Sequence, residues 1–596
     1  MSRHIDKAEL ISKLQTLEGL TVDERSSLIG LLREHKKYGL VWEDKPEDVE
    51  ERLRDSLPVL REVKDKAILS DDAAAPNHIL IEGDNLEALT ALSYTHEGKI
   101  DIIYIDPPYN TGNKDFVYND SFVDTEDSYR HSKWLSFMNK RLKIAKILLS
   151  SEGVIFISID DNEQAQLRLL CDEIFGSYNF QGHIHWRRRH NQPNDKNKLI
   201  ALVAEHVVVY SKNALQLKEF GVGKVAITGN FTNPDNDPKG PWTTNPWKAA
   251  NGRGGTHYSI TTPTGVVLTE TWYGTKETFE EYLKKGRVHW TNGGNGIPRI
   301  KIYQKEAEES GQCANNWWPN DTFGCNQDAT NEMKDIFDGI CPFDNPKPTK
   351  LLSVILRLGS IKKRSTILDF FAGSGTTLHA TMQLNAEDGG HRQCILVTNN
   401  ENNICEEVTY ERNKRVINGY TTPKGVEVAG LKTNTLRYYK TDYISRDRTQ
   451  KNMRNLVSAA TDLLCIKEDL YEERKTFGHF NLKPQLARYF NNGKKHMLIV
   501  YREELIDEIA EEIKNLDFGK MRLKIYVFSP GRYAFNDNFR EVEDKVELVA
   551  LPAAIYDAYQ KVLPKRREKL FETEEKKETT PVSHDLFANE EEGGEA

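Results

Sequence analysis

Two short motifs carry residue types that could act on a small ligand. The first, Asp106-Pro107-Pro108-Tyr109, follows the apolar run "IDIIYI". The Asp106 carboxylate and the Pro107 carbonyl can accept hydrogen bonds from an amino group. Pro108 stiffens the corner, and the Tyr109 ring offers a face for stacking on a flat base. A rigid exit from a strand, with Asp106 capping the next turn, is the alternative interpretation.

The second motif is "ILDFFAGSGTT", residues 367–377, in which an apolar strand leads to Gly373-Ser374-Gly375. Glycines permit a tight turn and a close approach of backbone to ligand before a helix begins. No lysine follows the glycines as in a Walker A loop, and the third glycine of the dinucleotide fingerprint is absent. The motif predicts a nucleotide-type pocket, with a purely structural glycine turn as the alternative.

Both motifs follow predicted strands in a region where short apolar runs alternate with helices. The expected strands are 78–84, 100–106, 153–160 and 206–212, and the expected helices are 85–95, 128–150 and one ending near 175. This alternation predicts an α/β fold with a largely parallel, doubly wound sheet and helices on both faces. The two motifs would then meet at one edge of that sheet.

Composition changes along the chain divide it into six parts. We expect a helical arm at 1–70, a first α/β part at 71–212, an irregular insert at 213–340, a second α/β part at 341–445, a small α/β domain at 446–566 and a disordered acidic tail at 567–596. The insert is rich in Gly, Asn, Trp, Thr and Tyr, which is typical of a recognition surface grafted onto a scaffold.

Overall composition limits the classes of protein that fit. The chain has 596 residues and a net charge of −9, so contact with nucleic acid would require local basic patches. Its seven cysteines include no CxxC pair, which favours reduced thiols and a cytoplasmic location. No apolar run is long enough to span a membrane, and no HExxH pattern occurs, so we expect neither a membrane segment nor a metal.

One basic stretch, residues 185–198, reads "HWRRRHNQPNDKNK". Trp186 beside Arg187, Arg188 and Arg189 suits base stacking and phosphate contact, so these four residues are candidate DNA-binding residues. A solvated loop is the alternative.

The order of the motifs, with Asp-Pro-Pro-Tyr first and the glycine loop after an irregular insert, resembles the β class of amino-group DNA methyltransferases. The stretches "HILIEGDNLEALTAL", "YRHSKWLSFMNKRL" and the two motifs resemble, more narrowly, the modification subunit of Type III restriction-modification systems. The resemblance covers roughly residues 38–440. It implies a Rossmann-like sheet that binds S-adenosylmethionine, with the insert as a target-recognition domain.

The resemblance also implies roles for individual residues. Asp106, Pro107, Pro108 and Tyr109 would bind the target base, and Lys347 would lie near the cofactor's carboxylate. The remaining cofactor residues implied in this way are Asp84, Asn85, Asp369, Phe371, Ala372, Gly373, Ser374, Gly375 and Thr376. Where the family has an acid for the ribose, this chain reads "TNNEN", which leaves Glu401 as the candidate.

The implied activity is methyl transfer from S-adenosylmethionine to N6 of an adenine flipped out of double-stranded DNA. Asp in the first motif position favours adenine over N4 of cytosine in this family. The implied partners are DNA, a second copy in a homodimer, and a restriction subunit with helicase and nuclease activity. Other enzymes share the Asp-Pro-Pro-Tyr type of corner, so methylation of glutamine or RNA is an alternative. A DNA-recognition module with little catalysis is another.

Overall fold

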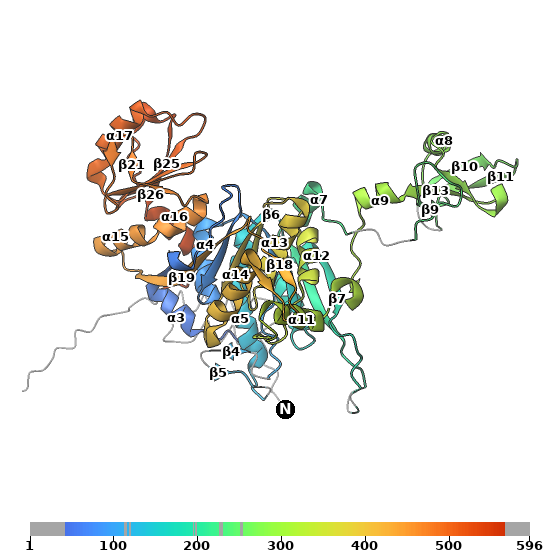
Figure 1. Ribbon diagram of the computed structural model, residues 1–596, viewed down its shortest axis with the longest axis horizontal. Helices are drawn as coiled ribbons and strands as arrows, with labels where there is room; N and C mark the ends of the chain where they lie inside the picture. Colours follow the sequence, from blue (N-terminus) through green and yellow to red (C-terminus); the bar gives the residue numbers. More distant parts are fainter. Residues whose placement is uncertain are drawn as a thin grey trace, which may run out of the picture.

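The computed structural model describes residues 42–112, 116–118, 121–124, 126–194, 196, 199–225, 230–250 and 254–566. The expected tail at 567–596 and most of the expected arm, residues 1–41, lie outside these described residues. Figure 1 shows a central body, a lobe formed by the middle of the chain, and a C-terminal lobe. No described helix is both long and apolar enough to cross a membrane.

The body is built on a ten-stranded sheet in the order β1-β19-β2-β16-β15-β3-β6-β8-β7-β14. In that order the strands are β1 (Ser56–Glu62), β19 (Thr435–Ser445), β2 (Asn77–Glu82), β16 (Gln393–Thr398), β15 (Thr366–Asp369), β3 (Ile100–Ile105), β6 (Leu149–Ile159), β8 (Ala204–Ser211), β7 (Phe180–Arg187) and β14 (Trp317–Trp318). The strands from β19 to β6 are all parallel, while β1 and β8 pair antiparallel with their neighbours. The predicted α/β class is confirmed, with antiparallel pairing added towards both edges.

Helices cover both faces of this sheet. One face packs against α4 (Asn85–Thr95), α5 (Arg130–Leu148) and α6 (Gln164–Phe175), and the other against α11 (Asn326–Ile336), α12 (Thr349–Gly359), α13 (Thr376–Asp388) and α14 (Glu411–Asn418). Successive side chains of a strand point to opposite faces, so β3 sends Ile103 and Ile105 into one core and Ile102 and Tyr104 into the other. Burial on both faces explains why its sequence is apolar without alternation.

The middle of the chain forms a separate lobe that projects away from the body in Figure 1. It contains β9 (Trp242–Pro246), β10 (Thr256–Thr261), β11 (Val267–Trp272), α8 (Lys276–Lys284), β12 (Val288–Trp290) and β13 (Pro298–Tyr303), followed by α9 (Gln304–Ser310). We call residues 230–310 of this region the inserted lobe. Its small core consists of Trp247, Ile260, Trp272, Phe279 and Ile300.

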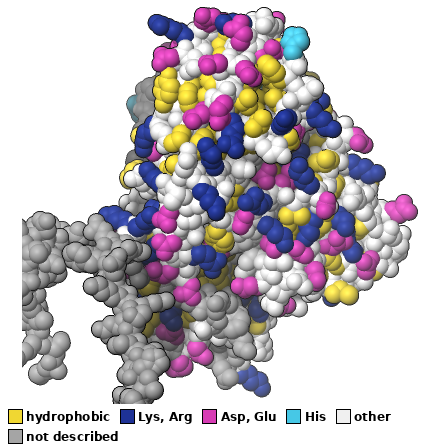
Figure 2. Space-filling view, turned by 90° about the vertical axis from the view of Figure 1, so that its left-hand side faces the viewer, with side chains coloured by type: hydrophobic (Ala, Val, Ile, Leu, Met, Phe, Trp, Pro, Cys, Tyr) yellow, Lys and Arg dark blue, Asp and Glu magenta, His cyan; other side chains and the backbone are white. Residues whose placement is uncertain are grey.

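The C-terminal lobe has a five-stranded sheet in the order β20-β23-β24-β25-β26. Its elements are β20 (Glu473–Arg474), β23 (Ala487–Asn491), β24 (His496–Val500), α17 (Ile506–Asn515), β25 (Leu523–Phe528) and β26 (Val546–Leu551). The helices α15 (Gln450–Ala459), α16 (Thr461–Glu468) and α18 (Ala553–Gln560) contribute to the body's own core. Figure 2 shows acidic and basic side chains interspersed over this lobe and the body below it.

Two expected domain boundaries are wrong. Residues 56–62, expected in a helical arm, form β1 and pair with β19, because "LPVL" supplies a buried strand. The end of the expected insert also belongs to the body, since Trp318 of β14 and Ile336 of α11 lie in the core of the large sheet.

Candidate active site

The two motifs identified in the sequence meet at one cavity of about 1230 Å³. Their strands, β3 and β15, are parallel neighbours in the sheet, so both motifs leave the sheet at the same edge. The motif residues that line the cavity are Asp106, Pro107, Pro108, Tyr109, Asp369, Phe371, Ala372, Gly373, Ser374, Thr376 and Thr377. A site for one small ligand is usually 300–1,000 Å³, so this cavity has room for more than one ligand.

The corner after β3 is held rigidly from several directions. The Tyr109 hydroxyl donates to Asp106 Oδ1 at 2.7 Å, and the Trp134 indole donates to the Pro108 carbonyl at 2.7 Å. Asn110 has a positive φ of 58° and donates to Glu163 Oε1 at 2.6 Å. These contacts fix the direction of the Asp106 carboxylate and of the Tyr109 ring before any ligand binds.

Lys347 lies beside Asp106. Its Nζ is 2.7 Å from Asp106 Oδ2, 3.0 Å from the Tyr109 hydroxyl and 3.5 Å from Glu205 Oε2. Burial alone would lower the pKa of Lys347, but the carboxylates of Asp106 and Glu205 outweigh burial and raise that pKa, so the side chain is cationic. Lys347 therefore contacts Asp106 and Tyr109, two of the expected base-binding residues, and its expected role near the cofactor's carboxylate stays a prediction.

Glu205, at the start of β8, is a member of the site that sequence reasoning missed. Its Oε1 accepts from Arg188 Nη1 at 2.6 Å, and its Oε2 accepts from the Tyr109 hydroxyl at 3.3 Å. Burial, followed by the charges of Asp106 and Glu205, raises the pKa of the Tyr109 phenol well above its ordinary value. No motif marks Glu205 in the sequence, because it acts through residues far away along the chain.

The glycine loop after β15 is organised by Asp369. This buried carboxyl accepts from the Phe371 amide at 3.0 Å and from the Thr377 hydroxyl at 2.6 Å, and burial raises its pKa to about 7. Gly373 and Gly375 have φ of 48° and 73°. A Cβ on Gly373 would come within 2.9 Å of the Phe343 ring. The loop therefore requires glycine, both for its conformation and for space.

The other expected cofactor residues lie on the same side of the cavity as the glycine loop. Asp84 lines the cavity and caps α4 through the Leu86 amide at 2.7 Å, while Asn85 donates to the Phe370 carbonyl at 3.2 Å. Asn85 and Gly375 support the loop but do not line the cavity. Glu401 follows β16 and does line it.

A wall of the cavity comes from the segment before β1, which sequence reasoning assigned to an arm. Glu47, Asp48, Val49 and Arg52 line the cavity. Glu47 accepts from the fully buried Arg141 at 2.9 and 3.0 Å. One nitrogen of Arg141, Nη2, is buried without a hydrogen-bond partner in the described part of the chain, at 3.6 Å from Asp84 Oδ2.

The basic stretch is only partly available to DNA. The prediction that Trp186 stacks on a base is wrong, because its ring is fully buried and its indole donates to the Gly324 carbonyl at 2.9 Å. Arg188 faces the cavity and pairs with Glu205. Arg187 donates to the carbonyls of Arg189 and His190, and Arg189 is exposed. DNA contact by the three arginines stays a prediction.

Comparison with known proteins identifies the family. The family model described as DNA methylase matches residues 100–418, more than half of the chain. The chain belongs to this DNA methylase family. Both halves of the cavity, the corner at 106–109 and the glycine loop, lie inside the matched range.

Relatives within the DNA methylase family confirm the resemblance to Type III modification subunits. The chain is 39% identical to the Type III restriction-modification enzyme StyLTI Mod subunit of Salmonella typhimurium, over 54% of this chain and 52% of that protein. It is 32% identical to the EcoPI Mod subunit of Escherichia phage P1, over 54% and 58% of the two chains. The Type II methyltransferase M.KpnI of Klebsiella pneumoniae is 34% identical, over 57% of this chain and 84% of that protein. The alignments span little more than half the length of the two Mod subunits.

Proposed function

We propose that this protein transfers a methyl group from S-adenosylmethionine to N6 of an adenine in double-stranded DNA. The observation that carries the proposal is the meeting of the Asp106-Pro107-Pro108-Tyr109 corner and the glycine loop at the ends of two adjacent strands, around one cavity. One motif offers acceptors for an amino group and the other offers a backbone cradle. The cavity is large enough to hold a cofactor and a base together.

The residues of the glycine-loop side fit S-adenosylmethionine. Glycine at 373 and 375 leaves the loop backbone open to close approach, and the 13-residue helix α13 begins directly after it, so its amides favour a carboxylate. Phe371 supplies an apolar ring, and Asp84 and Glu401 supply acceptors for hydroxyl or amino groups. When bound, the cofactor supplies a methyl group on a positively charged sulfur.

The corner residues would act on the amine of the base. An exocyclic amine is a poor nucleophile because its lone pair is delocalised into the ring. Hydrogen bonds from N6 to Asp106 and to the Pro107 carbonyl favour a tetrahedral nitrogen, which localises the lone pair for attack on the methyl group. Lys347 forms an ion pair with Asp106, and each Asp106 oxygen retains a second lone pair beside its present partner.

The base must leave the duplex to reach this corner, and the Tyr109 ring lies beside Asp106 for it to stack on. Positioning and electrostatics then account for catalysis, without a covalent intermediate on the protein. An N4-cytosine amine has the same chemistry, so cytosine is the second candidate. The identity of the methylated base in the DNA distinguishes the two candidates.

We further propose that the chain is the modification subunit of a Type III-like system. Its similarity to two Mod subunits supports this assignment. A restriction subunit would then be its partner, and a homodimer on DNA its working form. An enzyme with this substrate acts where chromosomal DNA lies, so we expect it in the cytoplasm.

Modification-sensitive sequencing tests the proposal. DNA from a methylation-free host that expresses the chain should carry N6-methyladenine at one short motif, and Asp106→Ala should abolish the mark. N4-methylcytosine instead would assign the second candidate. Unmodified DNA in a host whose protein binds S-adenosylmethionine would refute methylation of DNA.

A further inference from the structure

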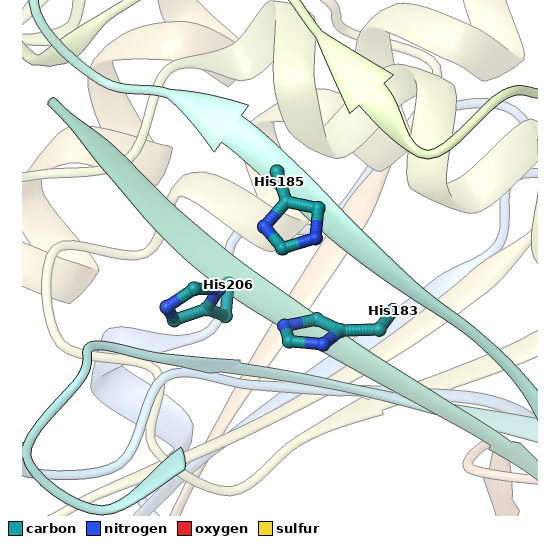
Figure 3. A group of neighbouring side chains, drawn as sticks. All are labelled: His183, His185 and His206. Carbon is teal, nitrogen blue, oxygen red and sulfur yellow. The ribbon is translucent and has the colours of Figure 1, made fainter.

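Three histidines gather on the face of the sheet formed by β7 and β8. His183 and His185 are two positions apart on β7 and therefore point to the same face, and His185 is the direct cross-strand partner of His206 on β8. Figure 3 shows the three rings turned towards one another. The HxH pattern "HIH" at 183–185 is the sequence signal for this cluster, and it differs from the HExxH pattern considered above.

The spacing of these rings is close to that of a metal site. Ring centroids are 4.6 Å apart for His183 and His185, 4.7 Å for His183 and His206, and 5.4 Å for His185 and His206. One nitrogen from each ring lies within 4.8 Å of the others. Zn²⁺ binds imidazole at 2.0–2.1 Å, which separates tetrahedral ligands by about 3.4 Å. Small side-chain rotations would bring the three nitrogens to that separation.

The hydrogen bonds of the cluster leave lone pairs unused. His206 Nε2 lies 2.9 Å from Asp161 Oδ1, so this nitrogen carries the proton and Nδ1 carries the lone pair. Among the described residues, His206 Nδ1 is buried without a hydrogen-bond partner, and so is His183 Nε2. A carboxylate that holds the far nitrogen of an imidazole is the usual support for a metal-binding histidine.

We propose that His183, His185 and His206 bind a divalent transition-metal ion, with Zn²⁺ as the occupant, and that Asp161 positions His206. Three imidazoles suit zinc, cobalt, nickel or copper, whereas magnesium and calcium require oxygen ligands. This proposal revises the expectation that the chain binds no metal.

The position of the cluster gives the metal a structural role. Glu205 and Asp160 line the active-site cavity, and their chain neighbours His206 and Asp161 belong to the histidine cluster. A metal would therefore tie β7, β8 and the turn before α6 together, directly behind one wall of that cavity. It would fix the base of the β7–β8 connection that carries Arg188 and Arg189.

A second group of potential metal ligands, formed by His190, Cys325 and Asp328, must be distinguished from the three histidines. Its cysteine is buried at the start of α11, whereas its histidine and aspartate are exposed. Cobalt distinguishes the two groups, because a cysteine ligand adds a thiolate-to-cobalt charge-transfer band that nitrogen and oxygen ligands lack.

The test uses the full chain without a histidine tag, stripped of metal with a chelator. Titration with Co²⁺ should give one strong binding event with tetrahedral visible bands and no thiolate charge-transfer band, and Zn²⁺ should displace the cobalt. His183→Gln and His206→Gln should weaken binding by about 100-fold or more, and Asp161→Asn by about 10-fold. His257→Gln, an exposed histidine in the inserted lobe, is the matched control and should bind as the parent does.

A thiolate band, or equal affinity in the parent and His206→Gln, would overturn the assignment. If the glutamine variants fail to fold, the cobalt spectrum of the parent decides, and absence of binding there refutes the site. Metal should also raise the Tm of the parent and of His257→Gln but not of His183→Gln. None of these readouts depends on methylation, so they stand apart from the proposed function.

Discussion

The active-site cavity and the inserted lobe are assembled from different ranges of sequence. Asp106 and Lys347, which form an ion pair in the cavity, are 241 positions apart. Arg412 donates to Thr376 Oγ1 at 2.7 Å, directly after the glycine loop, and to Glu332 Oε2 at 2.9 Å, across 80 positions. In the inserted lobe, Trp247 bonds Tyr258 across 11 positions, and its whole core lies between 247 and 300. The cavity depends on the complete body, whereas the lobe is a local unit. A lobe built in this way can change without disturbing the cavity.

The strongest test of this difference removes the charge that joins distant parts of the cavity. In Lys347→Met, Asp106 loses its buried cationic partner while Glu205 keeps Arg188, so the cost should not exceed the roughly 3–5 kcal/mol of breaking a fully buried ion pair. We expect methylation to fall by about 100-fold or more and the Tm of the body to drop, while DNA affinity changes little. Single-turnover methylation, calorimetry and fluorescence anisotropy measure the three quantities.

Lys350→Met is the matched control, because Lys350 lies three residues after Lys347, in the first turn of α12, and is exposed. Unchanged methylation in Lys347→Met would show that the ion pair has no part in catalysis.

The complementary test disrupts the inserted lobe. Trp272 is fully buried there and donates to the Tyr258 carbonyl at 2.8 Å, so Trp272→Ala should cost the lobe about 3–5 kcal/mol. We expect DNA affinity to fall by at least 10-fold, while affinity for S-adenosylmethionine stays within about 2-fold. Hydrogen exchange should increase between 230 and 310 but not in the large sheet.

The control is Val267→Ala in the same strand, since Val267 is 61% exposed. Loss of cofactor binding in Trp272→Ala would contradict the independence of the lobe.

The same contrast between local contacts and contacts of distant segments explains which features could be predicted from the sequence. The strands, helices and both motifs depend on local patterns, and α4 begins and ends at the expected residues. The partners of Lys347, the presence of Glu205 and the wall from 47–52 depend on how distant segments dock, which no local pattern records. The prediction that Trp186 stacks on a base is wrong because a tryptophan beside three arginines is typical of a DNA contact and equally of a buried strand.

A third prediction concerns the glycine loop. Glycine is required at position 375 both by the local backbone conformation and by a close contact with a residue distant in the sequence. Gly375 has φ of 73°, and a Cβ there would come within 2.5 Å of Asn413 Nδ2. Gly375→Ala should therefore weaken S-adenosylmethionine binding by about 10-fold, as titration calorimetry would measure, because the loop must shift. Gly389→Ala separates backbone strain from the steric clash, since Gly389 has φ of 65° but no atom of the described residues lies within 4 Å of its Cβ position. If the two variants lost the same amount of affinity for S-adenosylmethionine, the loss in Gly375→Ala would come from backbone strain alone, which costs about 1–2 kcal/mol.

The smallest expected effect concerns Glu163, which supports the Asp106 corner through Asn110. Burial raises the pKa of Glu163 from 4.5 to about 8 and lowers that of His131, whose Nδ1 lies 2.6 Å from Glu163 Oε1, so the pair is neutral at pH 7. The folded state then holds a proton that the unfolded chain has already released. Between pH 4.5 and 8 this lowers the free energy of unfolding as pH rises, by at most about 1.4 kcal/mol per pH unit.

Glu163→Gln keeps an oxygen that accepts from Asn110 and removes the titration. Denaturant unfolding across this pH range should therefore show that the free energy of unfolding of the variant, relative to that of the parent, increases with pH, with little difference at pH 5 and a gain near pH 8. Methylation at pH 7 should change less than in Lys347→Met, because Glu163 does not line the cavity. Parallel stability profiles in the two proteins would mean that Glu163 is ionised in the folded state. The inference that a protonated Glu163 supports the Asp106 corner would then be wrong.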